Sequence, residues 1–76
     1  MKIPVSERAL STRIRRALEK EGMTLRRARG TRALLDFGDW YVINTRMNAV
    51  VDKDIGLEDY GRELGVLKDF EELAED

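Results

Sequence analysis

The sequence predicts an α+β fold for one domain over residues 1–76, with an N-terminal helix, a small antiparallel sheet and a C-terminal helical segment around a shared core. Three observations predict this class. Apolar residues recur at helical spacing between residues 10 and 18. Two runs of β-branched and aromatic residues, 40–43 and 49–51, flank a short polar connection. Helical spacing returns after residue 56.

The first helix is expected to begin after Ser6, whose hydroxyl can accept a hydrogen bond from a first-turn backbone N–H. Val5 and Leu10 stand at the two positions of a hydrophobic staple, which fixes how the chain enters a helix. The apolar stripe of this helix consists of Leu10, Ile14, Ala17 and Leu18. Gly22 is the expected C-terminal stop.

The segment Met23–Arg29 fits two structures, a continued helix or a short strand. Leu25 and Ala28 would extend the helical stripe, whereas Met23 and Leu25 also alternate with polar neighbours. A glycine inside a helix costs about 1 kcal/mol relative to alanine, so Gly22 favours a break and a strand. Residues 33–38 are expected to form a loop or a weak strand.

Residues 39–53 are expected to form an antiparallel hairpin, because Trp40–Ile43 and Ala49–Val51 are rich in strand-forming side chains. A three-residue loop with Asn48 in the left-handed region suits the connection, since asparagine accepts positive φ better than most residues.

Both faces of this hairpin are apolar, with Tyr41 and Ile43 on one and Trp40 and Val42 on the other. A small domain supplies cover for one face only, so the other is expected to contact a second molecule. Tyr41 and Ile43 better match a cover by the helices. Trp40 and Val42 are therefore the predicted interface residues.

In the C-terminal third, Gly56 is expected to cap a helix, and Gly65 followed by Val66 is typical of a Schellman ending. A last short helix is expected over residues 69–74. The predicted core consists of Leu10, Ile14, Leu18, Leu25, Ile43, Val51, Leu57, Tyr60 and Leu64.

The composition excludes several kinds of chemistry. The chain has no cysteine and no histidine, so disulfides, thiolate or imidazole metal sites and Ser-His or Cys-His catalysis are ruled out. The carboxylates gather at helix starts and in the tail Glu71–Asp76, where they should be solvated and keep ordinary pKa values. The acidic run Asp52–Asp59 departs from the EF-hand pattern. We therefore expect no enzyme, no cofactor, no metal and no small-molecule substrate.

No apolar stretch has the length of a membrane span or a signal peptide, which indicates a cytoplasmic protein without membrane contact.

The net charge of −1 conceals two oppositely charged halves. Residues 1–32 carry ten basic and three acidic side chains, whereas residues 33–76 carry four basic and twelve acidic ones. The two halves either neutralise each other within the fold or leave the basic half available to a polyanion. The candidate contacts for nucleic acid or an acidic partner are Arg13, Arg15, Arg16, Arg26, Arg27 and Arg29.

Two functions follow as hypotheses. The first is a non-catalytic interaction or assembly protein. It either self-associates as a homo-oligomer, for which a closed symmetric dimer is the commonest form, or binds another protein. The alternative is a nucleic-acid-binding accessory protein that uses the Arg-rich first 32 residues, since arginine contacts phosphates in bidentate fashion. The pI of about 5.5 and the absence of a legible binding motif count against the alternative.

The runs Asp39–Asn44, Asn48–Val51 and Gly61–Leu67 resemble a group of short, uncharacterised bacterial proteins. Proteins of that group carry a basic N-terminal helix before a similar hairpin and helical tail. The resemblance implies a free-standing cytoplasmic bacterial protein, and it carries over neither an activity nor any site residue.

Overall fold

The computed structural model describes residues 2–74, which form three helices and five strands. They are β1 (Ile3–Val5), α1 (Glu7–Glu19), β2 (Met23–Arg27), α2 (Thr31–Phe37), β3 (Trp40–Asn44), β4 (Ala49–Asp52), α3 (Leu57–Glu63) and β5 (Glu71–Leu73). One sheet is antiparallel with the order β2-β3-β4, and the other pairs β1 with β5 in parallel. The predicted α+β class is confirmed. No helix of the described part of the chain is long and apolar enough to cross a membrane.

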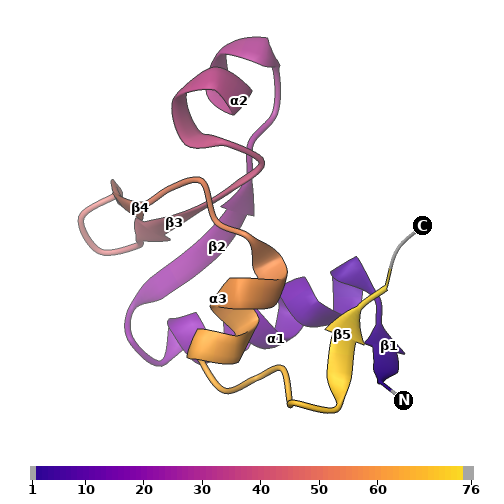
Figure 1. Cartoon of the computed structure of the whole chain (residues 1–76). Helices are drawn as coiled ribbons and strands as arrows, with labels where there is room; N and C mark the ends of the chain where they lie inside the picture. The colour runs from indigo at the N-terminus through magenta and orange to yellow at the C-terminus, as the bar shows by residue number, and fades with distance from the viewer. Residues whose placement is uncertain (1, 75–76) are drawn as a thin grey trace.

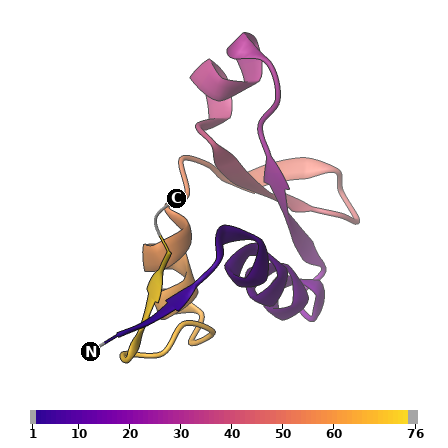
Figure 2. The same ribbon diagram turned by 90° about the vertical axis from the view of Figure 1, so that its right-hand side faces the viewer.

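The elements form two layers that meet along α1. Helices α1 and α3 lie together near β1 and β5, and α2 projects from the opposite end of the molecule (Figure 1). The view turned by 90° shows β1 and β5 side by side and the three-stranded sheet above α1 (Figure 2). The Cα trace measures 40 × 29 × 16 Å along its principal axes, so the molecule is clearly longer in one direction than it is thick.

Helix α1 begins as predicted. The Ser6 Oγ accepts a hydrogen bond from the Ala9 N–H at 3.1 Å, and both staple residues, Val5 and Leu10, are buried. Leu10, Ile14 and Leu18 are at most 1% exposed, which confirms three of the four residues of the predicted stripe, whereas Ala17 is half-buried. The helix ends at Glu19, and Gly22 adopts a φ of +75° before the chain turns into β2. Met23–Arg27 is therefore a strand and not a continued helix.

The prediction that Trp40 and Val42 occupy an open face is wrong. Val42 is fully buried, Trp40 is 9% exposed, and both pack in one cluster with Leu25 and the stripe of α1. Leu25 lies opposite Val42 in the β2–β3 register, so the helix covers the face that carries these residues. The reason is the alternation of β2, which places its only fully buried side chain, Leu25, on that face.

Residues 31–37 form α2 where a loop or weak strand was expected, so that prediction is wrong. None of the described side chains of α2 is buried, and Leu34 and Leu35 are 43% and 82% exposed, so no sequence pattern of buried residues could reveal this helix. Its last residue, Phe37, packs against Tyr41 with ring centroids 4.9 Å apart. Asp54 N–H donates to the Phe37 carbonyl at 2.8 Å, which ties the end of α2 to the segment after β4.

Helix α3 begins after Gly56 and ends in the predicted Schellman motif. The Val66 N–H donates to the Gly61 carbonyl at 2.9 Å, and the Gly65 N–H donates to the Arg62 carbonyl at 3.1 Å. The helix expected over residues 69–74 is not formed. Residues 71–73 are strand β5 instead, because β1 offers a parallel partner in which Ile3 lies opposite Glu71.

Most of the predicted core is buried, and two positions are wrong. Val51 is 51% exposed because β4 is irregular there, with Val50 opposite Ile43 and Asp52 opposite Val42. Leu64 is 37% exposed at the end of α3, and Tyr60 is half-buried. The core also takes in residues that the periodic patterns did not include: Val5, Trp40, Val42, Ile55 and Leu67.

Candidate functional site

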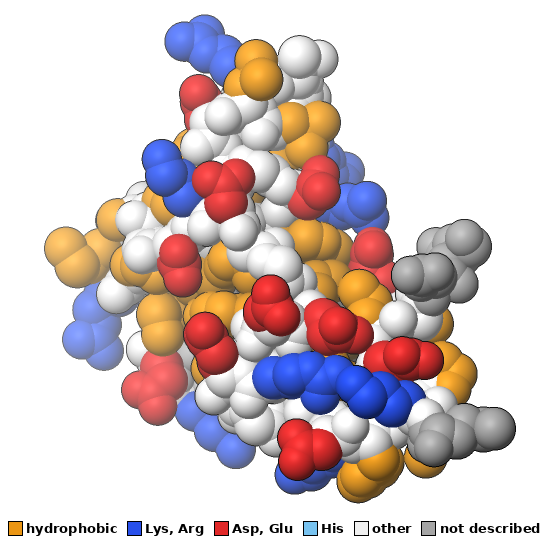
Figure 3. All heavy atoms as spheres, in the orientation of Figure 1, with side chains coloured by type: hydrophobic (Ala, Val, Ile, Leu, Met, Phe, Trp, Pro, Cys, Tyr) orange, Lys and Arg blue, Asp and Glu red, His pale blue; other side chains and the backbone are white. Residues whose placement is uncertain are grey.

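Acidic side chains gather over α3 and the end of β4, as the space-filling view shows (Figure 3). Asp52, Asp54, Asp59 and Glu63 line a shallow hollow of about 240 Å³ beside Tyr60. Burial raises the pKa of the Tyr60 hydroxyl above its ordinary value, and the charges of Asp52 and Glu63 raise it further. Within residues 2–74, no three carboxylates lie close enough together to hold a metal ion.

A second hollow, of about 630 Å³, is lined by arginines, and we call it the arginine hollow. Its lining consists of Arg15, Thr24, Leu25, Arg26, Arg27, Arg29, Trp40 and Tyr41. Four arginines therefore line one hollow, and no carboxylate belongs to the lining. Four of the six arginines predicted from the sequence are thus brought together.

The fold assembles the arginine hollow at the outer edge of the three-stranded sheet. Strand β2 is an edge strand, so only one of its sides is paired, with β3. Successive side chains of a strand point to opposite faces, which sends Arg26 and Arg27 to the two sides of this edge. Arg26 lies opposite Tyr41, and Arg27 lies opposite Trp40. Arg15 joins them from α1.

Arg27 is the most firmly held of the four arginines. Its Nη1 donates to the Glu7 Oε1 at 3.0 Å, and its guanidinium lies 5.4 Å from the centroid of the Trp40 ring. Glu7 is the first residue of α1, and Trp40 is the first residue of β3. Trp40 belongs to the lining of the arginine hollow, and Glu7 does not. Among the described residues, Arg15, Arg26 and Arg29 form no ion pair.

Arg13 does not reach the arginine hollow. Its Nη1 donates to both carboxylate oxygens of Glu71, at 3.0 and 3.1 Å, and to the Val66 carbonyl at 3.1 Å. The hydrogen bonds from Arg13 to the carboxylate, together with one from the Lys68 N–H, lower the pKa of the Glu71 carboxyl. Glu71 is thus a buried, paired residue and not the solvated acid that the sequence predicts. Of the other three tail acids, Glu72 is exposed as predicted, and Glu75 and Asp76 lie outside the described residues.

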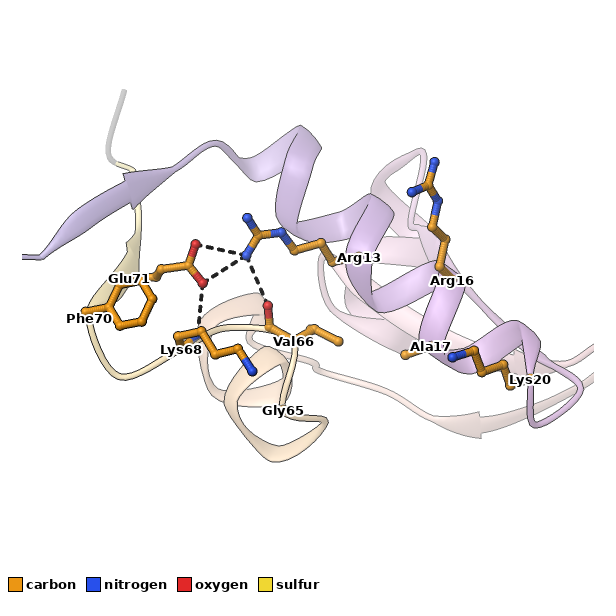
Figure 4. Close-up of a pocket in the computed structure, with 9 residues that line it drawn as sticks. All are labelled: Arg13, Arg16, Ala17, Lys20, Gly65, Val66, Lys68, Phe70 and Glu71. Carbon is orange, nitrogen blue, oxygen red and sulfur yellow. Dashed lines mark hydrogen bonds and ion pairs between the residues drawn. The ribbon is translucent and has the colours of Figure 1, made fainter.

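A third hollow, of about 530 Å³, lies on the other flank of α1, and we call it the helix hollow. Figure 4 shows its lining residues: Arg13, Arg16, Ala17, Lys20, Gly65, Val66, Lys68, Phe70 and Glu71. Arg16, the sixth predicted contact residue, belongs here. Sequence reasoning missed Lys68 and Phe70 as site residues, because nothing local connects them with a helix some fifty residues earlier.

Large apolar side chains are also exposed on α2 and, on another side of the molecule, on the β3–β4 hairpin (Figure 1). They belong to α2, the hairpin turn and β4: Leu34, Leu35, Met47, Val50 and Val51. Every residue of β4 is exposed, and the irregular pairing at Val51 interrupts this edge of the sheet.

In comparisons with protein-family models, curated proteins and solved structures, nothing matched this chain. The resemblance to short bacterial proteins therefore stays a prediction. The functions proposed below are argued from the charge and geometry of the chain itself.

Proposed function

We propose that the protein is a non-catalytic nucleic-acid-binding accessory protein that holds a sugar–phosphate backbone in the arginine hollow. The observation that carries the proposal is the convergence of Arg15, Arg26, Arg27 and Arg29 on one hollow whose lining includes no carboxylate. Guanidinium groups contact phosphate oxygens in bidentate, charge-assisted hydrogen bonds, and they keep their charge at any physiological pH.

The separation of charge supports the same function. An overall charge of −1 would oppose binding only if the acids stood among the arginines. The acids of α3 and β4 instead surround a different hollow, and Glu71 is neutralised by Arg13. A phosphate chain on β2 would therefore meet a locally positive surface. Contacts of this kind fix position without reading bases, so we expect affinity that depends little on sequence.

The test is a salt series of binding to a labelled DNA oligonucleotide, followed by fluorescence anisotropy. The logarithm of affinity should fall linearly with the logarithm of salt concentration, and Arg26→Ala or Arg29→Ala should each flatten that slope by about one. Arg46→Ala is the matched control, because Arg46 is an exposed arginine of the hairpin turn that lies outside the arginine hollow. Binding weaker than millimolar at about 50 mM salt, without a slope, would refute the proposal.

Self-association is a second candidate, and a different surface from the one first predicted favours it. Leu35 on α2 is 82% exposed, and Val51 on β4 is 51% exposed. Exposed large apolar side chains of this kind are typical of protein interfaces. Light scattering over a concentration series tests it: a mass that rises above that of the 8.8 kDa chain and returns to it in Leu35→Ser is expected. A constant monomer mass would refute it.

A further inference from the structure

We propose that the helix hollow is a second contact region for the same nucleic acid, and that it takes an unpaired base on Phe70 and phosphates further along the strand on Arg16 and Lys20. This inference rests on the proposed function and deepens it, since it identifies the ligand as a single strand. The carrying observation is an exposed aromatic ring in a cavity of about 530 Å³ that also holds four cationic side chains.

Phe70 has the properties of a stacking platform. Its side chain is 57% exposed, although the backbone around it is fixed. The Ile3 N–H donates to the Phe70 carbonyl at 2.7 Å, and the next residue, Glu71, donates from its N–H to the Lys68 carbonyl at 2.9 Å. Because the backbone is already fixed, a base that stacks on the exposed ring restricts only the side chain of Phe70.

The charges around Phe70 suit a nucleic-acid strand. Lys68 lies beside Phe70 at one end of the helix hollow, whereas Arg16 of α1 and Lys20, which caps α1, lie at the other end, beyond Arg13 and Glu71 (Figure 4). The carboxylate of the lining, Glu71, faces Arg13 and already accepts hydrogen bonds at both oxygens. Repulsion between this carboxylate and a phosphate is therefore reduced. Cationic grooves that carry an aromatic side chain are the common design of proteins that bind single strands.

The position of the two hollows explains why a single strand is favoured over a duplex. Helix α1 contributes Arg15 to the arginine hollow and Arg16 to the helix hollow, so the two sites flank the same helix. A flexible strand can cross the helix and occupy both. The bases of a duplex are stacked and paired inside, so they cannot reach Phe70 unless the duplex opens.

The experiment compares Phe70→Leu with the unaltered full chain on labelled oligo(dT), oligo(U) and a DNA duplex of equal length. Leucine keeps an apolar side chain and removes the ring. We expect single-strand affinity to fall about tenfold, since base–aromatic stacking contributes that much, and duplex affinity to stay unchanged. Leu35→Ala is the control, because it removes an exposed apolar side chain outside both hollows. Circular dichroism and the melting temperature verify that each variant is folded.

A fluorescence variant reports the site directly. Trp40 is the only tryptophan of the chain and lines the arginine hollow. Phe70→Trp should keep single-strand affinity and should add a second emission that oligo(dT) quenches by stacking. No added quenching would overturn the inference.

The outcomes separate this inference from the proposed function. If Phe70→Leu leaves single-strand affinity unchanged while Arg26→Ala weakens it, the inference fails and the proposed function stands. If no oligonucleotide shows salt-dependent binding, both fail. If poly-L-glutamate displaces oligo(dT) as well as unlabelled oligo(dT) does at equal charge, the helix hollow binds acidic polypeptides and the inference is overturned. A difference in affinity between oligo(dT) and oligo(U) shows whether DNA or RNA is preferred. A similar loss of affinity for both oligonucleotides in Phe70→Leu supports stacking on Phe70.

Discussion

Arg13 and Glu71 lie 58 positions apart in the chain, and the Arg13 Nη1 donates to both carboxylate oxygens of Glu71, at 3.0 and 3.1 Å. The same nitrogen reaches the Val66 carbonyl, and Arg62 donates to the backbone carbonyls of Lys68 and Glu71. Two arginines thus hold the last strand against the two main helices. Part of the opposite charge of the two halves is therefore neutralised within the fold, whereas Arg26 of β2 forms no ion pair with the described residues.

Removal of the Glu71 charge should change how stability depends on pH. The folded pKa of Glu71 lies below its ordinary value of 4.5, so its stabilisation is complete above that value and is lost as the pH falls through the lowered pKa. Glu71→Gln should therefore destabilise the protein near neutral pH and should lose less additional stability than the unaltered chain on acidification. Urea unfolding at neutral and acidic pH measures both. Glu72→Gln, at an exposed neighbouring position, should follow the unaltered chain.

Two glycines of similar conformation should respond very differently to alanine. Gly30 (φ +84°, ψ 155°) and Gly38 (φ +74°, ψ −167°) flank α2 in a region that other residues rarely adopt. A Cβ at Gly30 meets no atom within 4 Å, whereas one at Gly38 would lie 2.9 Å from the Asp54 Cα. Gly30→Ala should cost about 1–3 kcal/mol, from backbone strain alone. Gly38→Ala should cost more than about 3 kcal/mol by urea unfolding, because the strain and the clash add. Equal losses would show that Asp54 moves away freely.

The raised pKa of Tyr60 gives a prediction at alkaline pH. Burial, with Asp52 and Glu63, places it above the ordinary 10.0. Since the unfolded chain releases this proton at lower pH than the folded chain, stability should be complete below pH 10 and should decline as the pH rises beyond it. Asp52→Asn should shift the tyrosinate absorbance titration of Tyr60 to lower pH, and Tyr60→Phe identifies its part of the signal. An unchanged titration in Asp52→Asn would leave burial and the charge of Glu63 as the causes.

The features that the sequence predicted well are those decided by a few neighbouring residues. The Ser6 cap, the stripe from Leu10 to Leu18 and the Schellman ending at Gly65 all depend on groups within one or two helical turns. Asn48 likewise takes a φ of +53° at the end of the hairpin connection, as expected. In each case the local chemistry and the tertiary packing favour the same conformation.

The features that could not be predicted depend on partners far along the chain. Strand β5 exists because β1 supplies its pairing, and Glu71 is buried because Arg13 supplies its charge. Helix α2 was missed for a different reason. None of its described side chains is buried, so the sequence shows no apolar residues at helical spacing that would identify it. For the candidate site, the sequence identified the arginines of β2. It did not indicate which arginines share a hollow, nor that Phe70 and Lys68 line the same hollow as Arg16.

The position of Trp40 gives the sharpest test of which hairpin face is covered. Trp40 is 9% exposed and packs in the core with Leu25 and Val42, so Trp40→Ala should cost about 3–5 kcal/mol of unfolding free energy. Val51→Ala, on the exposed edge strand, should cost less than about 1 kcal/mol. Urea unfolding measures both losses of stability. Light scattering on the same samples should give the same mass for Val51→Ala as for the unaltered chain. A lower mass for Val51→Ala would place Val51 in an interface. If Trp40→Ala instead left stability unchanged and dissociated an oligomer, Trp40 would be an interface residue and the packing of α1 on this face would be wrong.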